Sequence, residues 1–299
     1  MDQLGQIPQL LVSGITNGCL YAIVAIGFSI IYNSTQVINF AQGEFVMVGA
    51  MIAATLVGKL SLGLAFPAAV LVGCLVGLFL AVCVLSPLRK ASVTTLIIIT
   101  VGASIMLRGL AQMIWGENAI QVQPFTPVER AGYLEDPTFH VFGAVVTAQE
   151  IWIIVVTGLL VLGMQLFFKY TLIGQGMRAC AMNATGARLV GISVKKMIVM
   201  SFVMAAGLGA VAGVTLAPVA YARFGMGAAL GLKGFCAGVL GGLGNFGGGI
   251  VAGLVLGITE ALAGGLLWSE YKDAIAFVIL VLILLIKPEG LLGRRRSEG

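Results

Sequence analysis

Residues 169–196 read KYTLIGQGMRACAMNATGARLVGISVKK and carry basic side chains but no acidic one. Strongly apolar segments lie on both sides of this stretch. Basic residues between membrane spans stay on the cytoplasmic side, because translocating them is costly and the field of the inner leaflet attracts them. We therefore expect residues 169–196 to form a cytoplasmic loop that determines the orientation of every span.

The same stretch has features of a docking element. Residues 178–190 are rich in good helix formers, Gly191 can end such a helix in a left-handed turn, and Ser193 can cap the next helix. A short helix with small residues on its surface suits a groove on another protein. The alternative is a solvated basic loop that only sets topology. The candidates for this contact are Arg178, Ala181, Ala184, Gly186, Arg188 and Gly191.

The composition of the chain excludes a water-soluble globule. Of its 299 residues, 59% are hydrophobic and 10% are charged, and the mean hydropathy is +1.06, whereas soluble domains carry about 25% charged residues. Long apolar runs recur along the chain, which is typical of polytopic helical membrane proteins. We predict an all-α fold over residues 1–299, a single transmembrane domain with about eight to nine transmembrane helices, some of them broken or short.

The loops indicate the orientation of the spans. Residues 115–149 form the longest polar loop, and their prolines and acidic excess fit the outer face. The basic turn near Arg89 and the basic C-terminal tail belong in the cytoplasm. This pattern requires about nine spans with the N-terminus outside, or about eight with the N-terminus inside if residues 33–44 re-enter the membrane. The net charge of +5 lies in such loops and is no sign of nucleic-acid binding.

The expected spans follow the apolar runs. They cover residues 10–31, 62–85, 93–114, 150–168, 197–219, 245–267 and 274–286, with shorter apolar pieces at 45–57 and 233–243 and outer turns at 220–231 and 270–273.

Two glycine-containing patterns stand out. Asn39-Phe40-x-x-Gly43 recurs as Asn245-Phe246-x-x-Gly249, and transporters are often built from repeats with such segments near the substrate site. The second pattern places glycines four residues apart on one helix face, at positions 249, 253 and 257. That spacing favours close helix packing over a role in ligand binding.

Three charged residues, Glu44, Arg108 and Glu260, lie in or beside apolar spans. A charge at membrane depth costs at least ~2.5 kcal/mol, so it usually faces a partner, a cavity or a pathway. An interfacial position for Glu44 and a snorkelling end for Arg108 are the alternatives. For Glu260, which lies deeper in its segment, we favour a pathway role or an intramembrane pair.

The sequence carries no sign of an enzyme. Neither an ATP-binding motif nor a hydrolase motif occurs, and His140 is the only histidine. The five cysteines form no CxxC pair and read as small apolar fillers; they are Cys19, Cys74, Cys83, Cys180 and Cys236. We expect no catalytic residue, metal or cofactor. If ATP drives the protein, another chain must hydrolyse it.

Several stretches resemble one family. They are NGCLYAIVAIGFSIIYNSTQVINFAQGEFVMVGA, then RACAMNATGARLVGI, LKGFCAGVLGGLGNFGGGIVAGLVLGITEAL and SEYKDAIAFVILVLILLIKPEGLLG. They resemble, in the same order and over nearly the whole chain, the LivH-type permease of branched-chain amino acid ABC transporters. The resemblance implies a permease in the bacterial inner membrane that carries leucine, isoleucine and valine, while relatives carry other amino acids, amides or urea.

The resemblance also implies partners. These are a second permease of the LivM type, two ATP-binding subunits and a periplasmic substrate-binding protein, with the lipid bilayer around the spans. Residues 169–196 then become the loop that couples to the ATPase. The candidates for the substrate pathway are Asn39, Gln42, Glu44, Arg108, Asn245 and Glu260.

Two departures from the family pattern leave alternatives open. Gln42 stands where the family usually has His, which leaves the substrate open between branched-chain amino acids and a relative such as urea or an amide. Met182 and Asn183 stand where Glu-Asp is common, which removes acidic charge from the docking helix. A stand-alone secondary transporter or channel, needing no ATPase, is an alternative of another class. A membrane scaffold leaves the basic helix unexplained.

Overall fold

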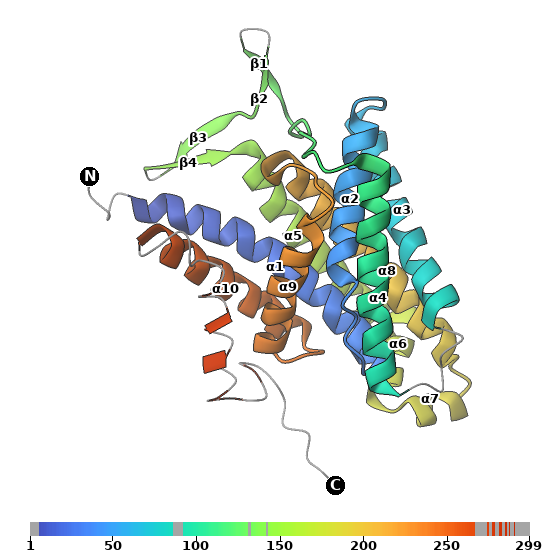
Figure 1. The fold of residues 1–299 in the computed structure, drawn as a ribbon. Coiled ribbons are helices and arrows are strands. Elements are labelled where there is room, and N and C mark those ends of the chain that lie inside the picture. The colour runs from blue at the N-terminus through green and yellow to red at the C-terminus, as the bar shows by residue number, and fades with distance from the viewer. Residues whose placement is uncertain are drawn as a thin grey trace.

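The computed structural model describes residues 6–85, 92–130, 133–141 and 143–266, with a few isolated positions between 274 and 290. Helices dominate these residues (Figure 1). They are α1 (Ile7–Thr35), α2 (Gln42–Val57), α3 (Leu62–Phe79) with the π-helical η2 (Leu80–Leu85), α4 (Val93–Trp115), α5 (Ala148–Tyr170), α6 (Leu172–Met182), α7 (Ala184–Leu189), α8 (Val194–Ala220), α9 (Met226–Gly241) and α10 (Phe246–Leu266).

Six helices within the described part are long and apolar enough to cross a membrane, namely α1, α3 with its extension, α4, α5, α8 and α10. The apolar helices α2 and α9 are shorter. The expected span 274–286 and the turn 270–273 lie outside the continuously described residues, so the count of about eight to nine spans stays a prediction.

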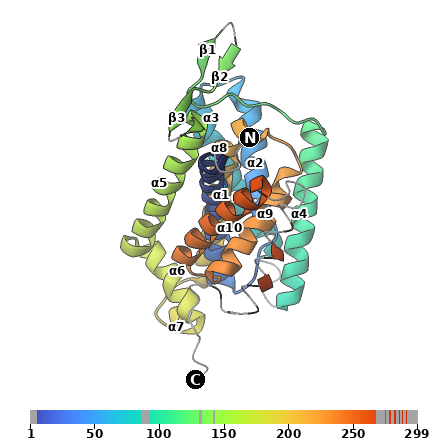
Figure 2. The same ribbon diagram turned by 90° about the vertical axis from the view of Figure 1, so that its left-hand side faces the viewer.

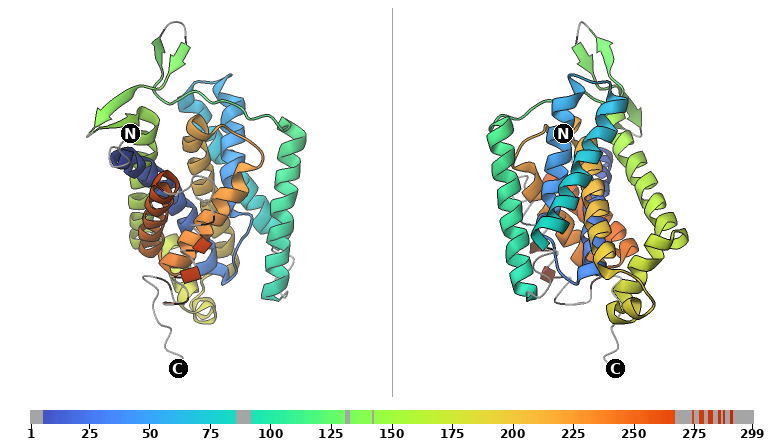
Figure 3. Two further views of the ribbon diagram at one scale, coloured as in Figure 1. Left: turned by 60° about the vertical axis from the view of Figure 1, so that its left-hand side comes forward. Right: turned by 90° about the vertical axis from the view of Figure 1, so that its right-hand side faces the viewer.

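The core of the bundle is formed by α1 and α8, whose middle turns are buried on nearly every side. Figures 2 and 3 show α4 on one flank of this core and α5 on the opposite flank. The flanking helices expose wide apolar faces, as expected where lipid or another membrane subunit covers them.

Close packing of α10 on α1 explains the glycine spacing. A Cβ added at Gly253 would collide with the backbone at Ala22, and one at Gly257 would collide with the backbone of Gly14 and Gly18. Without side chains at these positions the two helix backbones come into direct contact. The expectation of helix packing at these glycines is confirmed.

The predicted helical fold is confirmed for most of the described residues, but the loop between α4 and α5 also contains two antiparallel hairpins. The strands β1 (Val128–Arg130) and β2 (Tyr133–Glu135) form one, and β3 (Thr138–Val141) and β4 (Ala144–Thr147) form the other. Alternate residues of β4 are buried, and Gly143 adopts the positive φ of 83° that the tight turn requires. Membrane hydropathy dominates the sequence pattern and hides such short strands.

The hairpins lie at the end of the bundle opposite to α6 and α7 (Figure 2). The N–H of Val145 in β4 donates a hydrogen bond of 2.8 Å to Oε1 of Gln9 in α1. The N-terminal end of α1 therefore lies at the hairpin end.

The prediction of a single helix over residues 178–190 is wrong, because Asn183 separates α6 from α7. Asn183 has an extended backbone, and its Oδ1 accepts the N–H groups of Thr185 and Gly186 at 3.0 and 2.8 Å. This bond caps α7 and ends α6. Gly191 has the expected left-handed φ of 85°. Ser193 is the N-cap residue of α8, although its side chain makes no capping bond.

The outer turn expected at 220–231 is also too long, because α9 begins at Met226. Gly227 and Gly231 of α9 approach the backbone of Gly43 in α2 so closely that an added Cβ would collide. This contact is made by tertiary packing, and hydropathy does not reveal it.

Candidate functional site

A buried ion pair joins α2 to α4. Glu44 lies in the first turn of α2 and is 1% exposed. Its Oε1 accepts Nη2 of Arg108 at 2.8 Å and the hydroxyl of Ser104 at 2.8 Å. The side chain of Arg108 is 35% exposed, so the pair is open on the arginine side. Within the described structure, Oε2 of Glu44 accepts no hydrogen bond and Nε of Arg108 donates none.

The chain between α1 and α2 positions this carboxylate. Gln36 ends α1 in a left-handed conformation with φ of 56°. Asn39 then accepts the N–H of Ala41 through its Oδ1 at 3.2 Å, and Thr100 of α4 accepts the N–H of Phe40 at 3.2 Å. These bonds hold the start of α2 against α4. The partial positive charge of the helix N-terminus also favours the Glu44 carboxylate.

Gln42 has a different environment from Glu44. It is fully buried between α1 and α8, and its Nε2 donates to the carbonyl of Ala205 at 3.1 Å. Gly27 of α1 leaves the space that the amide occupies. A change of residue type at position 42 therefore acts first on the packing of α1, α2 and α8, and a role of Gln42 in the pathway stays a prediction.

A second buried ion pair joins α9 to α10. Lys233 donates to Oε1 of Glu260 at 2.6 Å, and the Tyr21 hydroxyl of α1 donates to Oε2 at 2.9 Å. The ammonium group also lies over the Tyr21 ring, 5.7 Å from its centre. Each membrane-depth charge singled out in the sequence thus has a charged partner. Lys233 and Tyr21 were not predicted as partners, because their approach depends on helix packing.

Helix α9 contacts both ion pairs. Gly227 of α9 lies against the carboxylate of Glu44, and Lys233, less than two turns further on, holds Glu260. A shift of α9 relative to α2 would therefore change the surroundings of both carboxylates.

Asn245 lies apart from both ion pairs, at the start of α10. Its Oδ1 accepts the N–H of Gly248 at 3.1 Å, much as Asn39 accepts the N–H of Ala41 before α2. The repeated Asn-Phe-x-x-Gly pattern therefore corresponds to two similar helix starts. Asn33, near the C-terminal end of α1, donates to the carbonyl of Gly244 at 2.9 Å.

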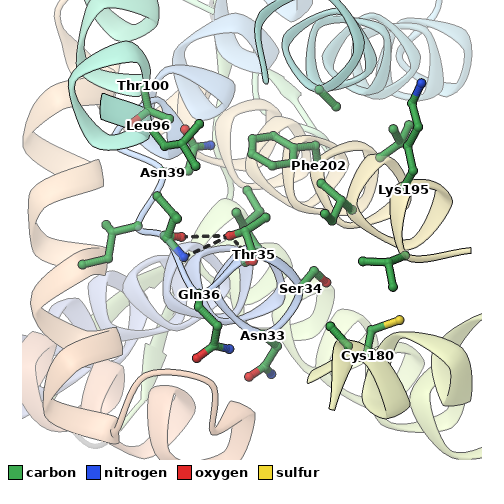
Figure 4. Close-up of a pocket in the computed structure, with 18 of the residues that line it drawn as sticks. Asn33, Ser34, Thr35, Gln36, Asn39, Leu96, Thr100, Cys180, Lys195 and Phe202 are labelled. Atoms are coloured by element: carbon green, nitrogen blue, oxygen red, sulfur yellow. Dashed lines mark hydrogen bonds between the residues drawn. The ribbon is translucent and has the colours of Figure 1, made fainter. Parts of the chain in front are cut away.

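A cavity of about 300 Å³ lies at the end of the bundle that carries α6 and α7, and Figure 4 shows residues that line it. Its walls are the C-terminal end of α1 and the chain after it, the start of α4, the segment from α6 to α7, and α8. The cavity brings Asn39, a pathway candidate, together with the coupling candidates Ala184 and Arg188. Its other polar wall residues, such as Lys195 and Thr100, were not identified from the sequence.

The segment from α6 to α7 exposes large apolar side chains. They are Leu172 (86% exposed), Met182 (89%), Leu189 (85%) and Val190 (76%). The basic residues Arg178 and Arg188 of the same segment are also exposed. We call these four apolar residues the coupling patch. The small residue Ala187 instead packs inward on Cys180 and Val194. The prediction that small residues form the surface of this segment is therefore wrong in part, because large apolar side chains are exposed and Ala187 is buried.

The described residues contain no group of acidic, histidine and cysteine side chains that could hold a metal ion. His140 lies on β3, exposed.

A helical membrane protein with buried ion pairs and an exposed segment at one end has the features of a transport subunit. The family described as "Branched-chain amino acid transport system / permease component" matches residues 10–284. The chain belongs to this family.

Individual relatives match over nearly their full length. The high-affinity branched-chain amino acid transport system permease protein LivH of Escherichia coli K12 is 34% identical, with 99% of each chain covered. The permease protein BraD of Pseudomonas aeruginosa is also 34% identical, with 100% of this chain and 99% of the relative covered. A probable LivH of Methanocaldococcus jannaschii is 30% identical, with 98% and 94% covered. A comparison with solved structures finds no match.

Proposed function

We propose that the chain is a permease subunit of an ABC importer for leucine, isoleucine and valine in the bacterial inner membrane. The observation that carries this proposal is the full-length similarity to relatives that are named branched-chain amino acid permeases. The second permease, the two ATP-binding subunits and the periplasmic binding protein are the partners that such a system needs.

The proposed orientation places residues 169–196 in the cytoplasm and the hairpins of residues 115–149 outside. The basic charge of the first segment supports this orientation. With the hairpins outside, the bond from Val145 to Gln9 supports an outer position for the N-terminal end of α1. The basic tail then lies in the cytoplasm after an odd number of spans.

The substrate pathway in this proposal runs along the faces of α2, α4 and α9. The Glu44–Arg108 pair supports this assignment, since its arginine is partly exposed while each partner retains an unused polar atom. Such a pair can exchange its internal contacts for the carboxylate and ammonium groups of an amino acid. Asn39, Gln42, Asn245 and Glu260 support the surrounding helices and remain candidates of the pathway.

The coupling patch is the proposed contact for the ATP-binding subunits. Large apolar side chains that protrude from a basic loop, outside the apolar spans, are typical of a protein interface. Arg178 and Arg188 lie beside the patch and suit acidic groups at the rim of a groove. Ala181, Ala184, Gly186 and Gly191 shape the two short helices that present it.

Reconstitution tests the proposal against its alternatives. The chain is purified with its proposed partners, placed in proteoliposomes, and supplied with binding protein outside and ATP inside. We expect uptake of radiolabelled leucine that requires ATP and continues when ion gradients are collapsed. Uptake driven by an ion gradient without the ATP-binding subunits would support a secondary transporter. Urea and acetamide in parallel assays test the substrates of related permeases.

A further inference from the structure

We propose that the cavity between α1, α4, α6–α7 and α8 binds a small carboxylate with a branched apolar side chain from the cytoplasm, and that its occupancy slows import. The inference rests on the proposed function for the orientation and for the substrate class. It adds a second ligand site within one subunit, separate from the Glu44–Arg108 pair.

Asn39 in the wall of the cavity carries a buried polar group without a partner in the described structure. Asn39 is 2% exposed, and its Nδ2 donates no hydrogen bond within the described structure. Its Oδ1 is already used by the N–H of Ala41. A buried amide donor without an acceptor is unfavourable, so a ligand oxygen at this position would stabilise the site.

The charges around the cavity favour an anion. Arg188 and Lys195 are exposed residues that line it, and no acidic residue is among its described lining residues. Ser34 and Thr35 lie along the same wall (Figure 4), where their hydroxyls donate to the carbonyls of Ile30 and Ile31. A carboxylate bound here has two cations and the unpaired amide of Asn39 near it, and no neighbouring carboxylate repels it.

The size and the apolar walls favour a short branched side chain. A volume of about 300 Å³ is at the lower end of the range for small-molecule sites. Leu96 of α4 and Val199 and Phe202 of α8 form part of the apolar wall. Leucine and its 2-oxo acid share this chemistry, because both join a carboxylate to the same isobutyl group.

The position of the cavity explains why occupancy would slow import. Its walls come from the segment that carries the coupling patch and from the connection that leads into α2 and Glu44. A ligand that contacts both stabilises one relative arrangement of these elements. Alternating access requires the arrangement to change, so imported product that accumulates inside would inhibit further import.

Binding is measured first, on the full complex in nanodiscs without the binding protein. The probes are radiolabelled leucine and radiolabelled 4-methyl-2-oxopentanoate. We expect Leu96→Trp, which fills the cavity, to abolish binding, and Lys195→Gln to weaken it about tenfold. Ile98→Trp on the exposed face of α4 and Lys196→Gln next to Lys195 are the matched controls, and both should bind as wild type does.

The two probes distinguish the source of the ligand. Equal binding of leucine and its 2-oxo acid assigns recognition to the carboxylate and the isobutyl group. Preference for leucine identifies the transported amino acid itself, and preference for the 2-oxo acid identifies a product of its deamination. Each of these results supports the site. If the wild-type complex binds neither probe, the inference is overturned.

Inhibition is measured in proteoliposomes preloaded with the tighter probe. Each variant is compared with its own uptake rate in empty proteoliposomes. We expect internal probe to slow wild-type, Ile98→Trp and Lys196→Gln import severalfold and to leave the relative rate of Leu96→Trp unchanged. Inhibition of Leu96→Trp to the same extent as wild type would overturn the inference.

The two proposals fail in different ways. If empty proteoliposomes import no branched-chain amino acid, the proposed function fails, while probe binding to the nanodisc complex still tests the cavity. If import is normal and neither probe binds, only this inference fails. Native mass spectrometry that finds an anionic phospholipid lost in Leu96→Trp, with no probe bound, would likewise overturn it and assign the cavity to lipid.

Discussion

The guanidinium Nη2 of Arg108 lies 2.8 Å from Oε1 of Glu44, so that a residue of α4 neutralises a carboxylate that is buried in α2. Figures 2 and 3 show α4 on the flank of the bundle, where it packs mainly on α2 and less on η2. The ion pair is therefore a main link between this flanking helix and the core.

Removing one charge of this pair should be worse for folding than removing both. Glu44→Gln or Arg108→Gln leaves one charge without its partner, and the loss for a fully buried pair is about 3–5 kcal/mol; the exposure of Arg108 reduces it here. We expect each single variant to melt at a lower temperature than the double variant Glu44→Gln/Arg108→Gln. Melting of the purified protein in detergent provides the measurement.

Import separates a role in the pathway from a role in stability. We expect uptake to fall about tenfold or more in all three variants, including the double variant that restores stability. A double variant with wild-type uptake would show that the pair only holds α4 in place.

Lys233 and Tyr21 both donate to Glu260, and their contributions to stability can be compared. Lys233→Met leaves the Glu260 carboxylate buried without a cation, whereas Tyr21→Phe removes one hydrogen bond to that carboxylate, worth about 1.5–3 kcal/mol. We expect Lys233→Met to lower the melting temperature more than Tyr21→Phe does. The reverse order would mean that the phenol stabilises the carboxylate more than the ammonium group.

The coupling patch should bind the ATP-binding subunits. Met182→Glu or Leu189→Glu puts a charge into an apolar contact, and we expect co-purification of these subunits to fall at least about tenfold. Phe139→Glu is the matched control, because Phe139 is an exposed apolar residue of β3 at the opposite end of the bundle. Normal co-purification of both patch variants would leave the segment as a solvated loop.

Labelling with a membrane-impermeant maleimide tests the orientation. In a background without the five native cysteines, Thr138→Cys in β3 should react in intact cells, and Thr185→Cys in α7 should react only after lysis. Gln9→Cys should react from outside, because Gln9 bonds to the hairpin. Reaction of Thr185→Cys in sealed cells would reverse the proposed topology.

The thiol of Cys180 provides a probe of the cavity. Burial raises the pKa of Cys180 above its ordinary value of 9.0, and the nearby charge of Arg188 partly opposes this rise. Little thiolate is therefore present at pH 7, and its fraction grows as the pH rises toward that pKa. With Cys180 as the sole cysteine, we expect labelling to accelerate between pH 7 and pH 9.

The contribution of Arg188 can be measured on the same thiol. Arg188→Gln removes the charge that favours the thiolate, so labelling of Cys180 should become slower at each pH. Lys196→Gln, which does not line the cavity, is the control. Equal rates in Arg188→Gln and wild type would contradict the electrostatic contact.

Structural features that extend over many residues could be predicted from the sequence, whereas short ones could not. Hydropathy located the six long helices to within a few residues, because burial in lipid requires a long apolar run. It failed where local bonds decide the structure, as at Asn183, whose side chain caps α7 and divides the helix that was expected over residues 178–190. It also failed for β3 and β4, which are too short for a periodic signal.

The candidate site shows the same division. Membrane-depth carboxylates are visible in the sequence because a charge inside an apolar run is costly, and this singled out Glu44 and Glu260. The residues that neutralise them lie 64 and 27 positions away. No local pattern links residues at such separations, so the partners could not be assigned.

The sequence by itself determined the class of the protein, the presence of a basic segment between apolar spans and the family, because composition, charge placement and motifs are properties of the chain. Only the tertiary structure decided that Gln42 is a packing residue, that Lys233 neutralises Glu260, and that Asn39 and Arg188 line one cavity. Those relationships arise from the close approach of helices, which glycines permit and which side chains distant in sequence complete.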